Sequence, residues 1–194
     1  QDINQLVGEI REIELGKKHR FRDSVGAWTC IRETLERLNN ELVEKNIKVE
    51  FESSTLEKIY FYGNKCLFIN SILTNIFKNS IKFSPDGGKI KIDLGKNENY
   101  LKIKISDDGI GIPKKIMKNL FVEGGGTSRP GTMGEPSHGL GLLILKESVA
   151  LLNGKIQIES LSINENINNH GTAVSITFPI INNQNGENDA FNNY

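Results

Sequence analysis

The chain has 194 residues, long enough for one domain with its own hydrophobic core. With 37% hydrophobic and 25% charged residues, it has the composition of a soluble globular protein. Acidic and basic residues balance at 24 each, which argues against a dedicated nucleic-acid binder, and no apolar run reaches the roughly 20 residues of a membrane span. Because the first residue is Gln rather than Met, we expect a cytoplasmic piece of a longer protein, and leave open whether the rest carries a membrane anchor.

Three segments in the first half of the chain have apolar residues at helical spacing. Residues 3–15 predict a helix, with a basic connector at 16–22 after it. Residues 28–46 predict a second helix, a short alternating strand follows at 47–51, and residues 64–82 predict a third helix. The predicted buried face of the second helix consists of Trp28, Ile31, Leu35, Leu38, Leu42 and Val43, and that of the third consists of Ile69, Ile72, Leu73, Ile76 and Phe77.

Strand patterns dominate the second half. Residues 89–94 and 101–105 alternate lysines with apolar residues, which predicts an antiparallel pair with one buried and one solvated face. The remaining predicted elements are a glycine-rich loop with one short helix, an apolar helix and two closing strands, at 107–138, 139–152, 155–159 and 173–178. We therefore predict an α+β fold, a two-layer α/β sandwich with a mixed, mostly antiparallel sheet packed against about three helices.

One face of the third helix carries residues suited to a metal and a phosphate. Asn75, Asn79 and Lys82 follow one another at spacings of four and three, which places them on the same side of a helix. An amide oxygen is a hard, neutral ligand for Mg²⁺, and a lysine one turn further on can meet a phosphate. Solvated helix faces also carry such residues, so this pattern alone does not separate the two interpretations.

A second candidate element follows directly on a predicted strand, and it reads Asp107-Asp108-Gly109-Ile110-Gly111-Ile112-Pro113. An aspartate at a strand end can accept a hydrogen bond from an exocyclic amine such as that of adenine, and glycines let a flat ring approach the backbone. Plain turns also use Asp-Gly. The position after a half-buried strand favours a binding site.

Two further glycine-containing segments complete the pattern. A loop ends in Ser137-His138-Gly139-Leu140-Gly141-Leu142, where an apolar helix begins, and the free amides of a helix N-terminus suit phosphate. It is not a Walker A motif, because no Gly-Lys-Ser/Thr follows, and it does not follow a strand as a dinucleotide fingerprint would. The last segment is Gly171-Thr172, directly before an apolar strand.

In this order the four elements resemble the catalytic and ATP-binding domain of sensor histidine kinases, within the superfamily of gyrases, chaperones, histidine kinases and mismatch-repair ATPases. The resemblance covers about residues 28–179, with an N-box-like stretch at 75–85 and glycine boxes at 107–111 and 138–142. It implies ATP and Mg²⁺ as cofactors and a mobile lid over ATP at 121–138.

The resemblance also implies roles for single residues. Asp107 would hydrogen-bond adenine, supported by Thr172 through water, and Gly109 and Gly111 would let the base pack closely. Asn79 would ligate Mg²⁺. The catalytic residues would be Asn75, Asn79 and Lys82. The implied nucleotide site consists of Asn75, Asn79, Lys82, Phe83, Asp107, Gly109, Gly111, Ile112, Thr127, Arg129, Thr132, His138, Gly139, Leu140, Gly141, Leu142 and Thr172.

Asn75 bears on the reaction. Relatives that hydrolyse ATP, and serine kinases that restrain sigma factors, resemble one another in placing a glutamate there as general base. An asparagine cannot take a proton at neutral pH, whereas a histidine acceptor already offers an imidazole nitrogen. Asn75 therefore favours transfer of the γ-phosphoryl group of ATP to histidine, by positioning and charge stabilisation.

The acceptor histidine is expected outside this chain. The sequences after His19 and His170 do not match the family's acceptor motif, and His138 lies in a glycine box. The expected partners are the dimerisation and phosphoacceptor helices of the parent protein and a response regulator receiver domain, without nucleic acid or membrane contact. The expected domains are the end of a dimerisation-type helix with its connector, the catalytic domain and a disordered Asn-rich tail, at 1–22, 23–179 and 180–194.

Two departures from the family pattern keep a second hypothesis open. Ser137 stands where the second glycine box usually has a glycine, and Phe121 is followed by Val122 rather than leading to a second phenylalanine. The alternative is a degenerate module that senses ATP or ADP, or docks a partner, without phosphotransfer. Asn75 disfavours an ATP-hydrolysing relative, and the ordered set of four motifs disfavours a purely structural domain.

Overall fold

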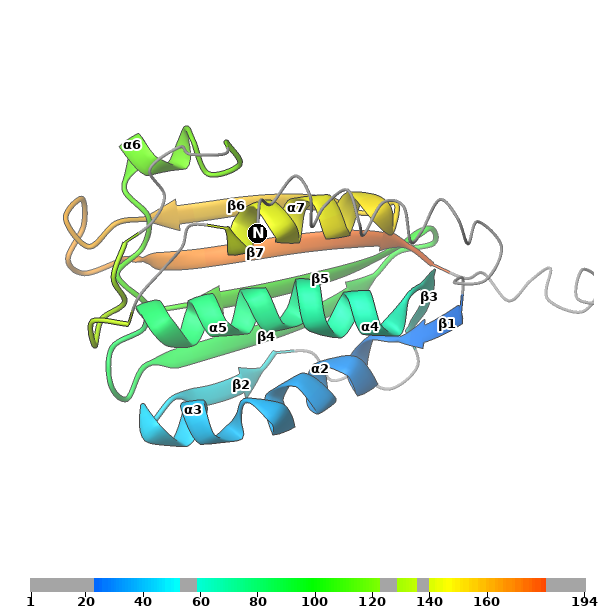
Figure 1. Cartoon of the computed structure of the whole chain (residues 1–194), viewed down its shortest axis with the longest axis horizontal. Coiled ribbons are helices and arrows are strands. Elements are labelled where there is room, and N and C mark those ends of the chain that lie inside the picture. Colours follow the sequence, from blue (N-terminus) through cyan, green and yellow to red (C-terminus); the bar gives the residue numbers. More distant parts are fainter. Residues whose placement is uncertain (1–22, 53–58, 123–128, 136–139, 181–194) are drawn as a thin grey trace, which may run out of the picture.

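The computed structural model describes residues 23–52, 59–122, 129–135 and 140–180. The predicted helix at 3–15, its connector and nearly all of the predicted tail lie outside the described residues. The described part forms a sheet with helices on one face, the α+β sandwich that the sequence predicts (Figure 1). None of the helices in these ranges has both the length and the apolar character needed to cross a membrane.

The main sheet has five strands in the order β2-β4-β5-β7-β6. β2 runs parallel to β4, and the other neighbours are antiparallel. Register places Ile92 opposite Ile105 on the buried face and Asp107 opposite Thr172 at one end of the sheet. The first and last glycine-containing segments therefore lie side by side. The strands are β2 (Lys48–Phe51), β4 (Lys89–Lys96), β5 (Tyr100–Asp107), β6 (Lys155–Leu161) and β7 (Gly171–Pro179).

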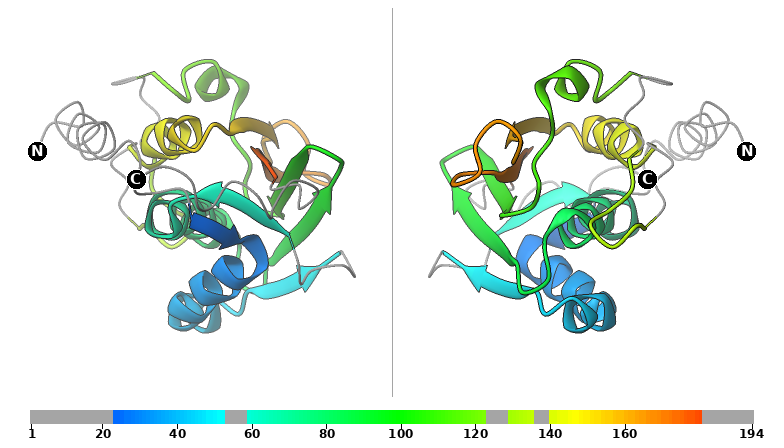
Figure 2. Two further views of the ribbon diagram at one scale, coloured as in Figure 1. Left: turned by 90° about the vertical axis from the view of Figure 1, so that its right-hand side faces the viewer. Right: turned by 90° about the vertical axis from the view of Figure 1, so that its left-hand side faces the viewer.

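Helices lie next to one another along one face of this sheet, as the end-on views show (Figure 2). They are α2 (Ala27–Arg37), α3 (Asn39–Glu44), α4 (Lys65–Leu67), the π-helical η1 (Phe68–Leu73), α5 (Thr74–Phe83) and α7 (Gly141–Leu151), and a short α6 (Lys114–Met117) lies at the rim. The third predicted helix is continuous through η1. There the hydroxyl of Thr74 donates to the carbonyl of Ile69, five residues earlier, at 2.8 Å, which suits the wider π turn.

A second, two-stranded sheet was not predicted. β1 (Asp23–Gly26) pairs antiparallel with β3 (Tyr60–Gly63). Both strands have four residues, too few for a period of two to stand out in the sequence. Phe61 of β3 is fully buried, and its ring lies 4.7 Å from that of Phe178 and 4.9 Å from that of Phe68, so aromatic packing joins this small sheet to the core.

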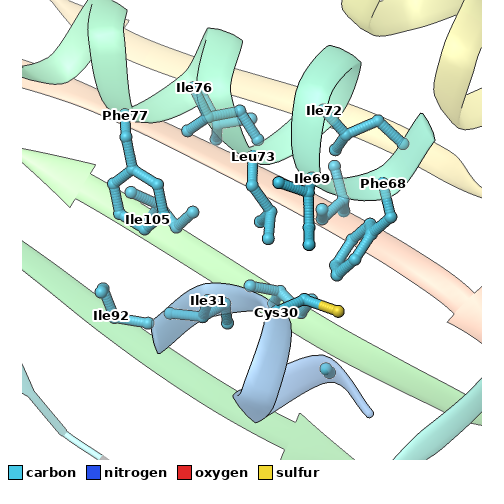
Figure 3. Packing of buried hydrophobic residues seen from close by; sticks show 14 of the residues in the cluster. Cys30, Ile31, Phe68, Ile69, Ile72, Leu73, Ile76, Phe77, Ile92 and Ile105 are labelled. Carbon is cyan, nitrogen blue, oxygen red and sulfur yellow. The ribbon is translucent and has the colours of Figure 1, made fainter. Parts of the chain in front are cut away.

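The core lies between the helices and the main sheet (Figure 3). Side chains of η1 and α5 point towards Ile92 and Ile105 of the sheet and towards Cys30 and Ile31 of α2. The predicted buried face of the third helix is confirmed in full, since its five apolar residues are all buried.

The predicted face of the second helix is wrong at both ends. The chain turns at Leu38 and divides the predicted helix into α2 and α3, so the helical phase of α2 does not continue to Val43, which is 64% exposed. Trp28 was expected in the core. It is only half-buried, and its ring packs edge-on against Phe51 with centroids 4.9 Å apart.

We expect Leu73→Ala to lower the free energy of unfolding by about 2–5 kcal/mol, because it leaves a cavity in a packed core. Val43→Ala is the control, since it removes an exposed side chain and should change stability by less than about 0.5 kcal/mol. Urea denaturation followed by circular dichroism measures both. Equal losses would contradict the burial described above.

Candidate functional site

A cavity opens between the helical layer and one end of the sheet. Helices α5 and α7 and strands β5, β6 and β7 contribute to its wall, and α6 lies at its rim. Most of the lining is apolar and consists of Ile76, Phe83, Ile112, Ile116, Leu120, Leu142, Leu145, Ile158 and Val174. Its polar side chains are Asn79, Ser80, Asp107, Arg129 and Thr172. Asp107 and Asn79, which come from two separate motifs, therefore line the same space, and a mostly apolar pocket with a few convergent polar groups is typical of a ligand site.

Asp107 ends β5 at this cavity. Its Oδ1 accepts hydrogen bonds from the backbone amides of Gly109 at 3.1 Å and Thr172 at 3.2 Å, and its Oδ2 accepts one from the Ser80 hydroxyl at 2.9 Å. Burial raises the pKa of Asp107 to about 6, the three hydrogen bonds act in the opposite direction, and the nearby Asp108 adds to the rise. The group is thus a rigidly held carboxylate at neutral pH, suited to accept a hydrogen bond from a ligand.

Gly109 and Gly111 bring backbone segments together. A Cβ on Gly109 would lie 2.6 Å from the carbonyl oxygen of Phe83, and one on Gly111, whose φ is 66°, would collide with the carbonyl of Leu161. The amide of Ile110 also donates to the Phe83 carbonyl at 3.0 Å. From the sequence, these glycines were expected to make room for a base. In the structure they let the loop after β5 pack against α5 and β6.

The predicted residues of α5 occupy different positions around the cavity. Asn79 lines it, and its side chain makes no hydrogen bond within the described part of the chain. Asn75 donates to the Ser71 carbonyl at 2.7 Å, and its Oδ1 would lie 2.9 Å from a Cβ on Gly141, so it faces the start of α7 beside the cavity. Lys82 lies outside the cavity wall, with its ammonium 5.3 Å from the centroid of the Phe83 ring. Burial lowers the pKa of Lys82.

Helix α7 begins at Gly141, and Gly141 and Leu142 line the cavity. The first amides of a helix have no intrahelical acceptor and carry a partial positive charge, so this end of α7 is suited to an anion. Leu140 is the residue just before α7. The other predicted members of this motif and of the loop before it, Thr127, His138 and Gly139, lie outside the described residues.

The segment 129–135 adjoins the same region. Arg129 lines the cavity, donates to the Gly111 carbonyl at 2.7 Å, and holds its guanidinium carbon 4.4 Å from the centroid of the Phe83 ring. Burial lowers the pKa of Arg129, and the charge of Asp107 opposes this. Thr132, also predicted for the site, is exposed and lies beyond the cavity wall, where its hydroxyl donates to the Ser84 carbonyl at 2.8 Å.

One polar residue that lines the cavity, Ser80, was not predicted from the sequence, and neither were two polar residues outside its wall, Ser160 and His170. Ser80 is buried on the apolar side of α5, four residues after Ile76. A serine within an otherwise apolar stripe could have marked it as a candidate site residue in the sequence. Ser160 lies opposite Thr172 in the sheet, accepts from the Ile112 amide at 2.8 Å and donates to the Gly171 carbonyl at 2.6 Å. His170 Nδ1 lies 2.6 Å from the Gly109 carbonyl oxygen. No local pattern marks the last two, because the fold alone brings Ser160 next to Thr172 and His170 next to the Gly109 carbonyl.

A comparison with known families matches residues 65–182 to the family described as "Histidine kinase-, DNA gyrase B-, and HSP90-like ATPase". This range includes every residue that lines the cavity. The chain belongs to this ATPase family. The resemblance to histidine kinase catalytic domains is thereby confirmed.

Curated relatives of this ATPase domain are named sporulation kinases and sensor histidine kinases. Sporulation kinase D of Bacillus subtilis (strain 168) is 30% identical over 179 residues, which cover 92% of this chain and 32% of that protein. Sensor histidine kinase WalK of the same organism is 36% identical over 113 residues, 57% of this chain and 18% of that protein. The chain spans about a third or less of the length of these relatives.

Solved structures show the same fold. The catalytic domain of histidine kinase ThkA, in a nucleotide-free form, has a TM-score of 0.66 at 21% identity, with 81% of this chain and 95% of that chain covered. Histidine kinase ThkA in complex with response regulator protein TrrA has a TM-score of 0.64 at 20% identity, with 92% of this chain and 48% of that chain covered.

We expect Asp107→Asn to raise the free energy of unfolding by about 1–3 kcal/mol at about pH 7.5, because the raised pKa means that ionised Asp107 is a net cost to the fold. The folded pKa of about 6 exceeds the ordinary 3.8, so this cost is absent well below pH 3.8, grows as the pH rises between the two pKa values and is constant above about pH 6. Urea denaturation at about pH 7.5 and about pH 4.5 should show the gap between variant and wild type closing on acidification. A gap that is independent of pH would contradict the shift.

Proposed function

We propose that this chain is the ATP-binding catalytic domain of a two-component sensor histidine kinase. It transfers the γ-phosphoryl group of Mg-ATP to a histidine outside the chain, for relay to a response regulator. The observation that carries this proposal is that Asp107 and Asn79 line the same cavity, next to the N-terminus of α7. One site thus offers an acceptor for a purine amine, an amide for a metal and a helix end for phosphates.

Asp107 would recognise the adenine. Its carboxylate is held by amide and hydroxyl donors from three elements, so it is oriented before the ligand arrives. The neighbouring wall of Ile112, Leu142 and Val174 suits the faces of a flat ring. A carbonyl oxygen in place of adenine's exocyclic amine could not donate to this carboxylate, which favours adenine nucleotides.

The residues of the site also fit a bound Mg²⁺. Asn79 offers a hard amide oxygen that no described residue occupies, and the Oδ1 of Asn75 faces the α7 terminus beside it. Within the described ranges no three His, Cys, Asp or Glu side chains gather as metal ligands, so phosphate and water oxygens would complete the coordination. When bound, the ion supplies neutralisation of phosphate charge. Lys82 and Arg129 would add positive charge near the phosphates.

Asn75 favours phosphotransfer over hydrolysis. It stands where hydrolysing relatives carry a glutamate, and an amide cannot accept a proton from water. Three hydrogen bonds hold Asp107 at the purine end of the site, so it would not serve as a general base at the phosphates. An acceptor imidazole would attack the γ-phosphorus, the bond to the bridging oxygen would break, and ADP would leave. The domain would act by orienting the reactants and stabilising charge.

The proposed partners follow from relatives of the same family. The curated relatives are named sensor and sporulation kinases, and a solved histidine kinase of the same fold is bound to a response regulator. We therefore propose dimerisation and phosphoacceptor helices of the parent protein, and a receiver domain, as partners of this chain.

Asp107→Asn should weaken ATP binding about ten- to a hundredfold, because an acceptor with a full charge becomes an amide that is half donor. Isothermal titration calorimetry at about pH 7.5 measures the affinity. Asp108→Asn is the matched control, since Asp108 accepts from the Lys89 amide away from the cavity and its loss should change affinity by less than about threefold. Equal affinity of Asp107→Asn and wild type would place the purine site elsewhere.

The same titration should depend on pH. Because the pKa of Asp107 is about 6, wild-type affinity should fall towards that of Asp107→Asn as the pH is lowered from about 7.5 to about 5. The variant controls for protonation of the nucleotide phosphates, which affects both proteins alike. A constant ratio of the two affinities across this range would contradict the role of an ionised Asp107.

Incubation with labelled ATP should leave this chain unlabelled, and an added phosphoacceptor-helix segment of the parent protein should acquire acid-labile label. Asn79→Ala should slow that transfer by about a hundredfold or more, because it removes the amide proposed to hold the metal and phosphates. Acid-labile label on His19 or His138 would contradict an acceptor outside the chain. Binding of ATP without transfer would support the degenerate module, and steady phosphate release without an acceptor would support hydrolysis.

A further inference from the structure

A buried lysine joins three segments that are distant in the sequence. Lys45, just after α3, is only 3% exposed. Its ammonium donates to the backbone carbonyl of Lys82 at 2.9 Å and lies 3.1 Å from Oε1 of Glu135. An ammonium removed from water needs such partners, since an unpaired one would strongly destabilise the fold. The contacts link the end of α3, the end of α5 and the segment 129–135, which is called the strap below.

The carbonyl of Lys82 is where these segments meet. It belongs to the last turn of α5, whose carbonyls have no intrahelical partner and carry partial negative charge. Besides Lys45, the backbone amide of Thr132 donates to it at 3.1 Å. The Thr132 hydroxyl donates to the carbonyl of Ser84, the next residue but one. The strap is thus bound to the end of the same helix that presents Asn79.

Glu135 holds the strap in a compact turn. Its Oε2 accepts from the Met133 amide at 2.9 Å while Oε1 pairs with Lys45, and its carbonyl accepts from the Gly131 amide at 2.9 Å. A Cβ on Gly131 would collide with Oε2 of Glu135 and lie 2.6 Å from Cγ of Lys82, so a side chain there would displace Glu135 or Lys82. Burial disfavours the charge of Glu135, but hydrogen bonds from its own amide, Lys45 and Met133 lower its pKa overall.

The strap also carries a residue of the cavity. Arg129 lines the cavity and contacts the Gly111 carbonyl and the Phe83 ring. Only Pro130 separates it from Gly131, and the ring of a proline restricts the backbone between the two. Fixing the turn at 131–135 therefore fixes the point from which the Arg129 side chain reaches into the cavity.

We propose that Lys45, acting through Glu135, is a positioning residue that holds Arg129 at the nucleotide cavity. Lys45 does not line the cavity, so any effect it has on the nucleotide passes through the strap. The inference rests on the proposed nucleotide binding. A lysine that only stabilised the fold would affect unfolding without a dependence on Arg129, and the experiment separates the two roles.

The test is a double-mutant cycle on ATP affinity. Lys45→Met removes the ammonium and roughly keeps the side-chain volume. Glu135→Gln removes the charge of its partner, and because the Glu135 side chain is 36% exposed, this variant should fold even if Lys45→Met does not. Each should weaken ATP binding about as much as Arg129→Met, by about five- to thirtyfold. Either change combined with Arg129→Met should weaken binding no further than Arg129→Met alone, because both act through the same contact.

Lys78→Met is the matched control. Lys78 is on α5, whose end Lys45 contacts, and its ammonium lies 3.4 Å from Glu41 at the surface. This variant therefore removes one lysine charge near the same helix without touching the strap. Its ATP affinity should stay within about twofold of wild type. Hydrogen exchange of the nucleotide-free proteins gives a second readout. The amides of Gly131 and Thr132 should exchange faster in Lys45→Met and Glu135→Gln but not in Lys78→Met.

The outcomes separate this inference from the function on which it rests. If the wild-type chain does not bind ATP, the proposed function fails, and hydrogen exchange still decides whether Lys45 holds the strap. If the wild type binds ATP and both variants bind it equally tightly, the positioning role is wrong. It is also wrong if their losses add in full to that of Arg129→Met.

Discussion

The buried carboxylate of Asp107 organises the part of the domain that carries its cavity. It accepts hydrogen bonds from Ser80 of α5, Gly109 of the loop after β5 and Thr172 of β7, so one side chain joins the helical layer, a loop and the sheet. Burial raises the pKa of Asp107, which means that the fold keeps an anion where water would solvate it better. Such a cost is typical of a functional site rather than of a group that serves stability alone.

The rest of the site depends on the rigidity of the elements around this carboxylate. One face of η1 and α5 is packed into the core, and the adjacent face presents Asn75 and Asn79 towards α7 and the cavity. A helix whose apolar stripe is fully buried cannot rotate without opening the core, so its polar residues are held in place by packing. Metal and phosphate recognition in the proposed function would rely on this fixed geometry, together with the end of α7.

The domain belongs to an ATPase family whose description spans histidine kinases, DNA gyrase B and HSP90. The pocket, its apolar wall and its aspartate suit adenine nucleotides in general. The proposed transfer to histidine rests on Asn75, because an amide at this position cannot act as a general base for hydrolysis. The chain spans a third or less of the kinases to which it is similar, so acceptor and partners are proposed from its relatives.

The sequence by itself determined the features that depend on local periodicity and on motif order. These are the α+β class, the buried face of the third helix, the alternation in β4 and β5, and the placement of Asp107 and Asn79 at one cavity. Helix and strand periods are properties of neighbouring residues, so they can be read without a structure. The same approach failed at Val43, because a turn at Leu38 interrupts the period.

Only the tertiary structure decided which distant residues meet. The pairing of β1 with β3, the contact of Ser160 with Thr172, and the contact of Lys45 with Glu135 depend on strand register and on helix packing between segments far apart in the chain. No residue type or spacing marks these partners in advance, because each is ordinary until the fold brings its partner within hydrogen-bonding distance.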